Sequence, residues 1–224
     1  MSISKKTLNI NGVDRMFIYD EEKDSLADVL RKIGLTGGVG CGKSAVLEYM
    51  EKAYAAVVLR SDELARELME PDGACYAAVC ALFEEEIRTE DGTLDRAKMA
   101  ERMYADDGLR QAVNAIVHPA VWEEIHRREE EAEANGTRVF CVESALLLTQ
   151  KDTASFDELW YVYADESVRR ARLQESRGYS EEKTTSIMAS QNSDAEFRAA
   201  CDVVIDNSGT KEETRRQIDR LLGE

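Results

Sequence analysis

The chain has 224 residues, of which 43% are hydrophobic, 33% charged and 7% aromatic. It is long enough for one or two domains with a buried core, and this composition excludes a collagen-like or wholly disordered chain. A formal net charge of −16 argues against nucleic-acid binding, because phosphate backbones need clustered Lys and Arg. The sequence shows neither the ~20-residue apolar run of a membrane helix nor a signal peptide, and its five scattered cysteines predict reduced thiols in a cytoplasmic protein.

The predicted elements begin with an N-terminal extension, residues 1–30, that contains a β-hairpin turning at Asn11-Gly12. Short apolar runs then alternate with amphipathic stretches, which predicts an α/β fold with a parallel sheet flanked by helices. Strands are expected at Lys32–Thr36, Ala56–Leu59, Arg138–Val142, Leu159–Tyr163 and Asp202–Ile205. Helices are expected at Lys43–Ala53, Asp62–Met69, Ala74–Glu84, Arg96–Tyr104, Leu109–Val117, Pro119–Asn135, Glu166–Ser176, Glu181–Gln191, Asp194–Ala200 and Lys211–Leu222.

Two all-helical regions interrupt this alternation within residues 31–224. Residues 61–137 are too long for a simple crossover between strands, which predicts a helical substrate-binding insertion. Residues 166–200 are rich in arginine and are interrupted at Arg177-Gly178-Tyr179, which predicts a mobile helical lid.

A phosphate-binding motif lies between the first strand of the predicted sheet and the helix that follows it. Residues 37–44 are GGVGCGKS and fit G-x-x-x-x-G-K-S. The glycines allow successive backbone N–H groups to turn inward as an anion nest at the positive end of the helix. Lys43 can then reach the β- and γ-phosphates, and the Ser44 hydroxyl is an oxygen ligand for Mg²⁺. The motif predicts nucleoside triphosphate binding without identifying the phosphate acceptor.

Candidate residues for the acceptor side follow the second strand of the predicted sheet. Because the carboxyl ends of parallel strands open on one edge, Asp62 is placed to accept a proton from an attacking hydroxyl. Arg66 lies one helical turn further on the same face. The spacing fits equally well an N-terminal helix carboxylate in an ordinary i,i+4 ion pair, so both interpretations stay open.

Three further features each have a catalytic and a structural interpretation. Glu143 ends the third strand of the sheet and could orient magnesium-bound water or be solvated. The predicted lid carries Arg169, Arg170, Arg172 and Arg177. We expect at least one of them to reach the phosphates when the lid closes, and a solvated face is the alternative. His118, before Pro119 at an expected helix start, is more often structural than catalytic in such a position.

Seven segments together carry a resemblance to a known family. They are IGLTGGVGCGKS (Ile33–Ser44), SDELARELMEPDG (Ser61–Gly73), DGTLDRAKMAERMY (Asp91–Tyr104), NAIVHPAVWEEI (Asn114–Ile125), ESALLL (Glu143–Leu148), RLQESRGYSEEK (Arg172–Lys183) and CDVVIDNSG (Cys201–Gly209). In this order they resemble dephospho-CoA kinase, and HPAV and VVIDNSG in series are more specific than the phosphate loop alone. The resemblance implies a P-loop kinase fold and Mg²⁺-dependent transfer of the γ-phosphoryl group of ATP to the ribose 3′-hydroxyl of dephospho-CoA, giving CoA and ADP.

The resemblance also implies roles for individual residues. Asp62 falls on the general base and Arg66 on a substrate-side arginine, and with Lys43 they form the expected catalytic set. The expected nucleotide-binding residues are Gly37, Gly38, Val39, Gly40, Cys41, Gly42, Lys43, Ser44, Ala45, Arg172, Arg177, Asn207 and Gly209. The expected acceptor-binding residues are Asp62, Arg66, His118 and Glu143. Ser44 is expected to hold Mg²⁺ through ATP, in a monomer or weak homo-oligomer that binds no nucleic acid or membrane.

The chain departs from the family pattern at a few positions. Arg60 stands where many members have the first aspartate of an Asp-x-Asp pair, and Ala45 replaces a usual Thr. Ala145 and Thr149 stand where Pro and Glu are common. Arg60 puts in doubt any metal or base role of its position, and Ala45 is a milder change because Ser44 remains. At Ala145 and Thr149 we expect weaker substrate positioning at most, because Lys43, Asp62 and Glu143 are intact.

The first 30 residues contain LNINGVDRMF and the start of DSLADVLRKIGLTG. Through these segments they resemble the opening hairpin and helix of the plant-type ferredoxin domain of molybdenum aldehyde oxidoreductases. That domain continues with clustered cysteines around an iron–sulfur cluster. Only Cys41 remains here, so no cluster is expected.

Three other functions stay open at this point. A small-molecule P-loop kinase acting on a nucleoside, nucleotide or sugar would share the nucleotide site. A regulatory NTPase would hydrolyse its nucleotide slowly without an acceptor, although the sequence has no guanine-reading N-K-x-D. An inactive fusion product, in which residues 1–30 block or destabilise the kinase, is the third.

Overall fold

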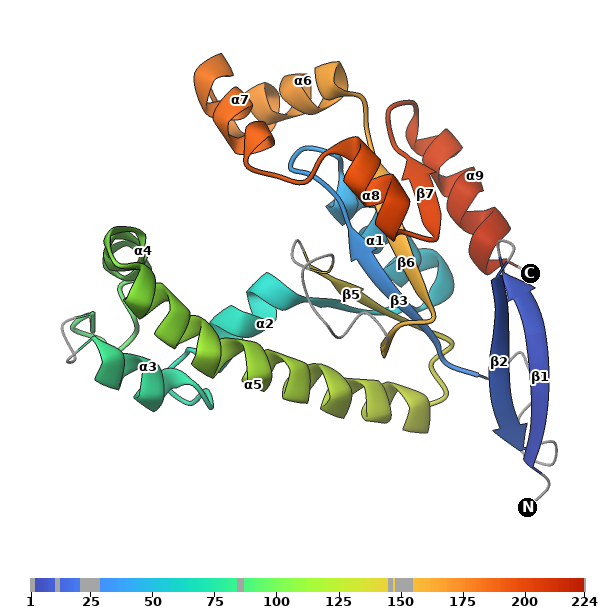
Figure 1. Cartoon of the computed structure of the whole chain (residues 1–224), viewed down its shortest axis with the longest axis horizontal. Helices are drawn as coiled ribbons and strands as arrows, with labels where there is room; N and C mark the ends of the chain where they lie inside the picture. Colours follow the sequence, from blue (N-terminus) through green and yellow to red (C-terminus); the bar gives the residue numbers. More distant parts are fainter. Residues whose placement is uncertain are drawn as a thin grey trace. The chain divides into compact units, whose positions relative to one another are not determined.

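The computed structural model describes residues 3–10, 13–20, 29–83, 87–144, 147 and 155–223. The chain divides into two compact units (Figure 1). The first, here called the sheet unit, comprises Met1–Val58 and Ala132–Glu224. The second, here called the helical unit, is Leu59–Glu131.

The sheet unit is built on a five-stranded sheet in the order β4-β5-β3-β6-β7. Its strands are β3 (Arg31–Thr36), β4 (Val57–Arg60), β5 (Val139–Glu143), β6 (Glu158–Tyr163) and β7 (Val203–Asp206). The pairings of β3 with β5, of β3 with β6 and of β6 with β7 are parallel. The five predicted strands and their parallel arrangement are confirmed, and no strand end differs from its prediction by more than one residue.

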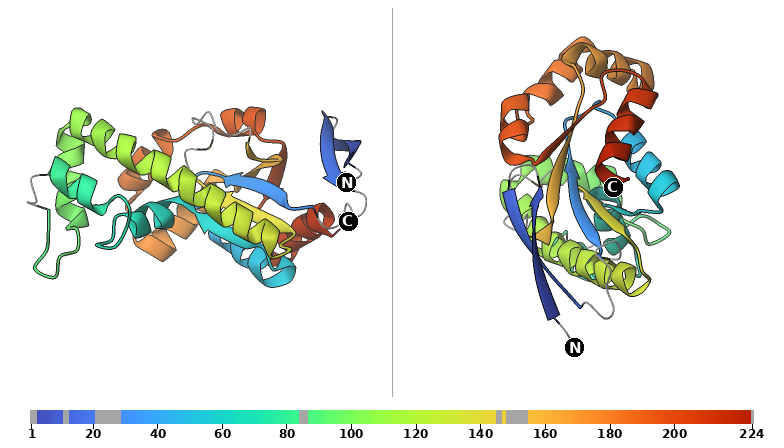
Figure 2. Two further views of the ribbon diagram at one scale, coloured as in Figure 1. Left: turned by 90° about the horizontal axis from the view of Figure 1, so that it is seen from below. Right: turned by 90° about the vertical axis from the view of Figure 1, so that its right-hand side faces the viewer.

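Helices cover both faces of this sheet, α1 (Lys43–Tyr54) and α9 (Lys211–Leu222) on one face and α8 (Asp194–Ala200) on the other (Figures 1 and 2). Successive side chains of a strand point to opposite faces, so alternate apolar residues reach α1 and α9. This core contains Ile33, Leu35, Val46, Leu47, Met50, Trp160, Val162 and Ile218. On the opposite face Phe197 of α8 stacks on Tyr161, with ring centroids 4.6 Å apart. Apolar burial on both faces is the main force that holds the sheet and its helices together.

A buried ion pair joins β3, β6 and α9. Glu158 is only 1% exposed and accepts two hydrogen bonds of 2.8 Å from Arg31 Nη2. It accepts a third, of 2.7 Å, from Trp160 Nε1, and Arg31 also donates to the Leu221 carbonyl. A buried carboxylate is tolerated only when it is paired and hydrogen-bonded, so these contacts specify how the three elements meet.

The helical unit consists of α2 (Ser61–Leu68), α3 (Tyr76–Leu82), α4 (Arg96–Ala105) and most of α5 (Asp107–Ala134). The sequence predicted two helices, Leu109–Val117 and Pro119–Asn135, where α5 is one. That prediction is wrong, and Pro119 lies inside the helix. His118 is therefore in mid-helix and not at a helix start.

The packing of α5 explains why it continues through the proline. Val113, Val117, Val121 and Ile125, spaced by four residues, are all buried. Each such side chain contributes roughly 1.5–3 kcal/mol on burial, whereas proline in a helix interior costs about 3 kcal/mol. The buried stripe therefore outweighs the local preference of Pro119 to end a helix.

The predicted lid contains α6 (Glu166–Arg177) and α7 (Glu181–Ala189), followed by α8. Gly178 ends α6 with a φ of 62°, in the left-handed region that favours glycine. Ser180 caps α7 by accepting a hydrogen bond from the Lys183 N–H. The predicted break between these two helices is confirmed.

The N-terminal residues form two antiparallel strands, β1 (Ile3–Ile10) and β2 (Val13–Asp20), with Ile10 opposite Val13. The paired strands of the predicted hairpin are confirmed, while its turn at Asn11-Gly12 lies outside the described residues. Ala145 and Thr149, two departures from the family pattern, also lie outside them. Among the helices that the structure describes, none is both long and apolar enough to cross a membrane.

Candidate active site

The phosphate-binding motif forms the turn between β3 and α1. Gly37, Gly40 and Gly42 have φ values of 153°, 78° and 90°, which residues other than glycine rarely adopt. A Cβ at Gly42 would also lie 2.2 Å from the side-chain nitrogen of Asn207. The turn thus sets the first N–H groups of α1 at the carboxyl end of β3, where an anion is favoured.

Lys43 folds back over this turn. Its Nζ donates a 2.8 Å hydrogen bond to the Gly37 carbonyl and lies 3.5 Å from Oε1 of Glu143. Both side chains are mostly buried, at 19% and 17% exposure, so the ammonium group has a defined place beside the loop. Glu143, at the end of β5, shares the sheet edge with Lys43.

Two residues remote in sequence hold the carbonyl of Cys41 in the loop. Asn207 Nδ2 donates to it at 2.8 Å and Arg172 Nη1 at 3.2 Å. Arg172 Nη2 also donates to the Asn207 carbonyl at 2.9 Å, and Thr214 Oγ1 donates to Asn207 Oδ1 at 2.8 Å. The structure therefore brings Asn207 and Arg172 to the loop, and the atoms that they contact there are backbone atoms.

The Cys41 side chain is not available for chemistry. The residue is 1% exposed, and burial raises the pKa of its thiol, although the charge of Lys43 opposes this shift. A protonated, buried thiol is a poor nucleophile and a poor metal ligand. Any contribution of Cys41 to an anion site therefore comes from its backbone.

The Ser44 hydroxyl is the candidate metal ligand at the turn. Ser44 and Ala45 are both exposed in the first turn of α1. Within the described ranges no group of three or more His, Cys, Asp or Glu side chains could hold a metal ion. Mg²⁺ prefers oxygen ligands and keeps several waters, so a magnesium ion here would need phosphate oxygens in addition to Ser44.

Of the four lid arginines, Arg169 also reaches the turn. Its Nε donates to the Val39 carbonyl at 2.8 Å, and its Nη2 donates to Oε1 of Gln191 at 3.2 Å. The Val39 N–H donates to the same Gln191 oxygen at 2.9 Å. The resemblance singled out Arg172 and Arg177 among the lid arginines and not Arg169, and the sequence contained no local signal for Gln191.

The remaining predicted nucleotide-binding residues lie elsewhere in the sheet unit. Arg177 is exposed at the end of α6, with its guanidinium carbon 5.8 Å from the centre of the Tyr179 ring. Arg170 pairs within the lid, with Glu166 and Glu181. Gly209 lies beside α9, in a cavity of about 570 Å³ lined also by Asp206, Glu213, Arg216, Gln217 and Arg220.

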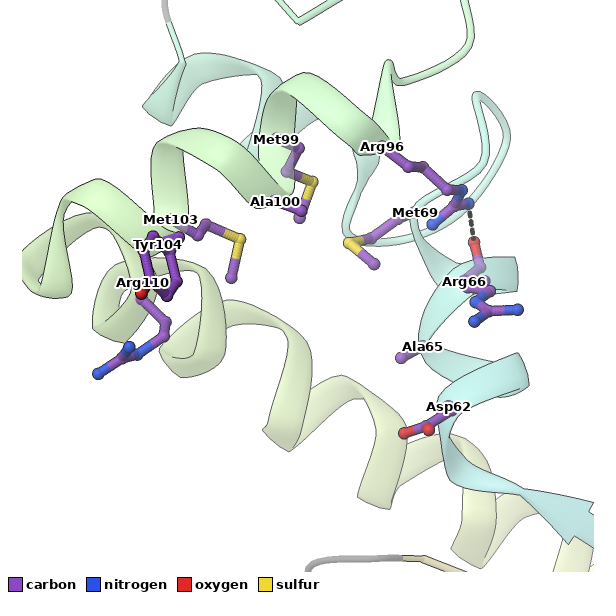
Figure 3. A pocket seen from close by; sticks show the side chains of 10 residues that line it. All are labelled: Asp62, Ala65, Arg66, Met69, Arg96, Met99, Ala100, Met103, Tyr104 and Arg110. Carbon is purple, nitrogen blue, oxygen red and sulfur yellow. Dashed lines mark hydrogen bonds between the residues drawn. The ribbon is translucent and has the colours of Figure 1, made fainter. Parts of the chain in front are cut away.

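The helical unit has a cavity of about 670 Å³ between α2 and α4 (Figure 3). Its lining residues are Asp62, Ala65, Arg66, Met69, Arg96, Met99, Ala100, Met103, Tyr104 and Arg110. The Asp62 carboxylate points into the space beside α2 (Figure 3). Met99 and Met103 line the cavity from α4 on the opposite side, and Met69 lines it from the end of α2 (Figure 3). This volume and this mostly apolar wall with a few charged groups are typical of a small-molecule site.

Asp62 and Arg66 both line this cavity, but they do not form the i,i+4 ion pair that was one interpretation of their spacing. Neither side chain has an ion pair or hydrogen bond with any residue that the structure describes. Arg96, by contrast, donates to the Arg66 carbonyl at 3.2 Å and pairs with Glu70 at 2.6 Å. His118, half-buried in α5, does not line the cavity.

A parallel sheet with this loop between its central strand and the following helix defines a P-loop kinase fold. Residues 31–213 match the family model CoaE, Dephospho-CoA kinase. The chain is 37% identical over 187 residues to the dephospho-CoA kinase of Shouchella clausii, covering 84% of this chain and 94% of that protein. The chain belongs to the dephospho-CoA kinase family.

Solved structures share the fold of this chain. TT1252 from Thermus thermophilus is similar with a TM-score of 0.74 and 25% identity, over 87% of this chain and 97% of that one. Dephospho-CoA kinase from Campylobacter jejuni shares the fold, with a TM-score of 0.60 and 15% identity, over 86% of this chain and 96% of that one. The match to the family model leaves residues 1–30 outside it.

Proposed function

We propose that the chain transfers the γ-phosphoryl group of ATP to the ribose 3′-hydroxyl of dephospho-CoA, giving CoA and ADP. The observation that carries this proposal is the match of residues 31–213 to the family. The 3′-oxygen bonds to the γ-phosphorus while the bond from that phosphorus to the β–γ bridging oxygen breaks. The hydroxyl proton passes to the Asp62 carboxylate.

The sheet unit binds the nucleotide in this proposal. Phosphoryl transfer depends mainly on positioning and on neutralising the charge of the phosphates. The N–H groups of the turn and the ammonium of Lys43 supply that charge, and Asn207 and Arg172 keep the turn in shape. Mg²⁺, held by phosphate oxygens and Ser44, would add further charge neutralisation.

The helical unit binds the acceptor, as the predicted insertion over 61–137 suggested. Dephospho-CoA carries a diphosphate and a long uncharged pantetheine arm. The charges of Arg66 and Arg110 suit the diphosphate, and the methionine-lined wall of the cavity suits the arm. Asp62, in the same cavity and without a partner among the described side chains, is available as the base.

The mobile lid in this proposal is residues 166–200, of which α6 contacts the phosphate loop through Arg169 and Arg172. A cytoplasmic enzyme, monomeric or weakly oligomeric, belongs to the same proposal. The five free cysteines support the reducing location. The ferredoxin-like character of residues 1–30 stays a prediction.

The test is ADP formation by the purified full-length chain with ATP, Mg²⁺ and dephospho-CoA. We expect Asp62→Asn to lower turnover by ~10²-fold or more, the scale of general-base catalysis, while affinity for ADP is retained. Glu63→Gln is the matched control, because Glu63 is the next carboxylate of α2 and does not line the cavity. Turnover of Asp62→Asn within a few-fold of wild type removes Asp62 from this role. ADP release with a nucleoside or sugar and none with dephospho-CoA favours another small-molecule kinase.

A further inference from the structure

The lid contacts the P-loop, residues 37–44, at Val39 through two residues, one in α6 and one just after α7. Arg169 of α6 donates to the Val39 carbonyl, and Gln191, just after α7, accepts from the Val39 N–H. The same Gln191 oxygen also accepts from Arg169 Nη2 at 3.2 Å. Val39, Arg169 and Gln191 therefore form one hydrogen-bonded cluster. It engages the backbone N–H and C=O of Val39 and the Nη2 of the guanidinium.

This cluster places the guanidinium directly against Gly38. A Cβ at Gly38 would lie 2.4 Å from Arg169 Nη2 and 2.8 Å from its Cζ. Gly38 is not among the described glycines with a positive φ. A side chain at Gly38 would therefore displace the guanidinium from the position that it has here.

The same stretch of the loop is where Lys43 lies, with its Nζ 2.8 Å from the Gly37 carbonyl. The lysine of this motif serves the β- and γ-phosphates, so the two cations flank the γ-phosphate end of the loop. A guanidinium presents a planar pair of donors that matches two phosphate oxygens. Arg170 cannot do this from its pairs with Glu166 and Glu181.

We propose that Arg169 contacts the transferred phosphoryl group and that Gln191 is the positioning residue that holds Arg169 over the P-loop. A glutamine oxygen suits this task because it accepts two hydrogen bonds without adding negative charge beside the phosphates. Gln191 acts through Arg169 and Val39, and it does not itself bind substrate. The inference rests on the proposed function only for the identity of the acceptor.

The test compares Gln191→Met, Arg169→Met and the double variant with wild type. Methionine keeps the length of the side chain and removes its hydrogen bonds. We expect Gln191→Met to lower kcat about tenfold while KM for ATP changes less than about threefold, because the guanidinium is misplaced and not lost. Arg169→Met should lower kcat ~10²-fold or more. The double variant should lose little more kcat than Arg169→Met, since of the two groups that Gln191 holds only the Val39 N–H then remains.

Gln174→Met is the matched control, because Gln174 is exposed on α6 and its side chain has no partner among the described residues. Its kcat should equal that of wild type. Gln191→Met should keep the wild-type circular dichroism spectrum, with a urea midpoint lowered only by the loss of its two part-buried hydrogen bonds. Multiplicative losses in the double variant, wild-type kcat in Gln191→Met, or equal losses of kcat and ATP affinity each overturn the inference. If dephospho-CoA is not an acceptor, the same four variants are compared in acceptor-free ATP hydrolysis, which tests the inference without the proposed substrate.

Discussion

Replacing Asn207 with alanine removes the side chain that joins the P-loop to α9. Asn207 is 6% exposed, and its amide makes two hydrogen bonds of 2.8 Å, to the Cys41 carbonyl and from the Thr214 hydroxyl. Each contributes about 1 kcal/mol net, and a buried partner left without a bond costs about 1–3 kcal/mol more. The change therefore acts on stability and on the shape of the loop together.

The remaining hydrogen bonds of the two partners of Asn207 determine how much stability the substitution removes. The Cys41 carbonyl keeps the 3.2 Å bond from Arg172, and the Thr214 hydroxyl keeps one of 3.3 Å to the Thr210 carbonyl. Neither group is left wholly without a partner, so we expect a loss of about 2–3 kcal/mol in the free energy of unfolding. For a chain of this size that lowers Tm by about 4–12 °C. Affinity for ADP should fall about tenfold, which is 1.4 kcal/mol, because the loop loses an anchor.

The assay is urea unfolding followed by circular dichroism, with ADP affinity measured by calorimetry on the same preparations. Asn135→Ala is the matched control, since Asn135 lies exposed in the turn after α5. Its stability should stay within about 0.5 kcal/mol of wild type. A loss below that value in Asn207→Ala, together with unchanged ADP affinity, would refute the role assigned to this side chain.

Two predictions concern α5. Pro119→Ala restores a helical N–H inside α5 and should raise stability by about 1–2 kcal/mol, because the helix gain of about 3 kcal/mol exceeds the entropy that proline removes from the unfolded chain. Urea midpoints check this, and a lower midpoint than wild type would show that the helix needs its proline. Glu124 accepts 2.7 Å hydrogen bonds from Arg127 Nε and Arg128 Nε, which lower its pKa to about 2. Because the carboxylate has a lower pKa in the folded chain than in the unfolded chain, its ionised form stabilises the fold at pH values above the unfolded pKa of about 4.3. That contribution is lost as the pH falls towards 2. Glu124→Gln should therefore cost about 1 kcal/mol at pH 7 and nothing near pH 2, and a pH-independent difference between the urea midpoints of the two proteins would contradict this.

The sequence by itself determined the sheet and the phosphate loop of this protein. Short apolar runs between polar turns are a property of neighbouring residues, so β3, β5, β6 and β7 were predicted within one residue. The motif at residues 37–44 is recognised locally because its glycines allow the positive φ values of the turn, although the remote Asn207 and Arg172 hold the turn in place. The caps of α7 and the break at Gly178 are local for the same reason.

The tertiary structure decided whatever depends on partners remote in the chain. Pro119 signals a helix end, and only the buried stripe along α5 shows that packing overrides it. Val39 and Gln191 are 152 residues apart, and no spacing in the sequence relates them. Arg169 and Arg177 are the same residue type in the same helix, and only the folded chain shows which one contacts the P-loop. Hydrogen bonds between residues far apart in the chain depend on where the tertiary structure places each side chain, and a local sequence pattern does not predict that.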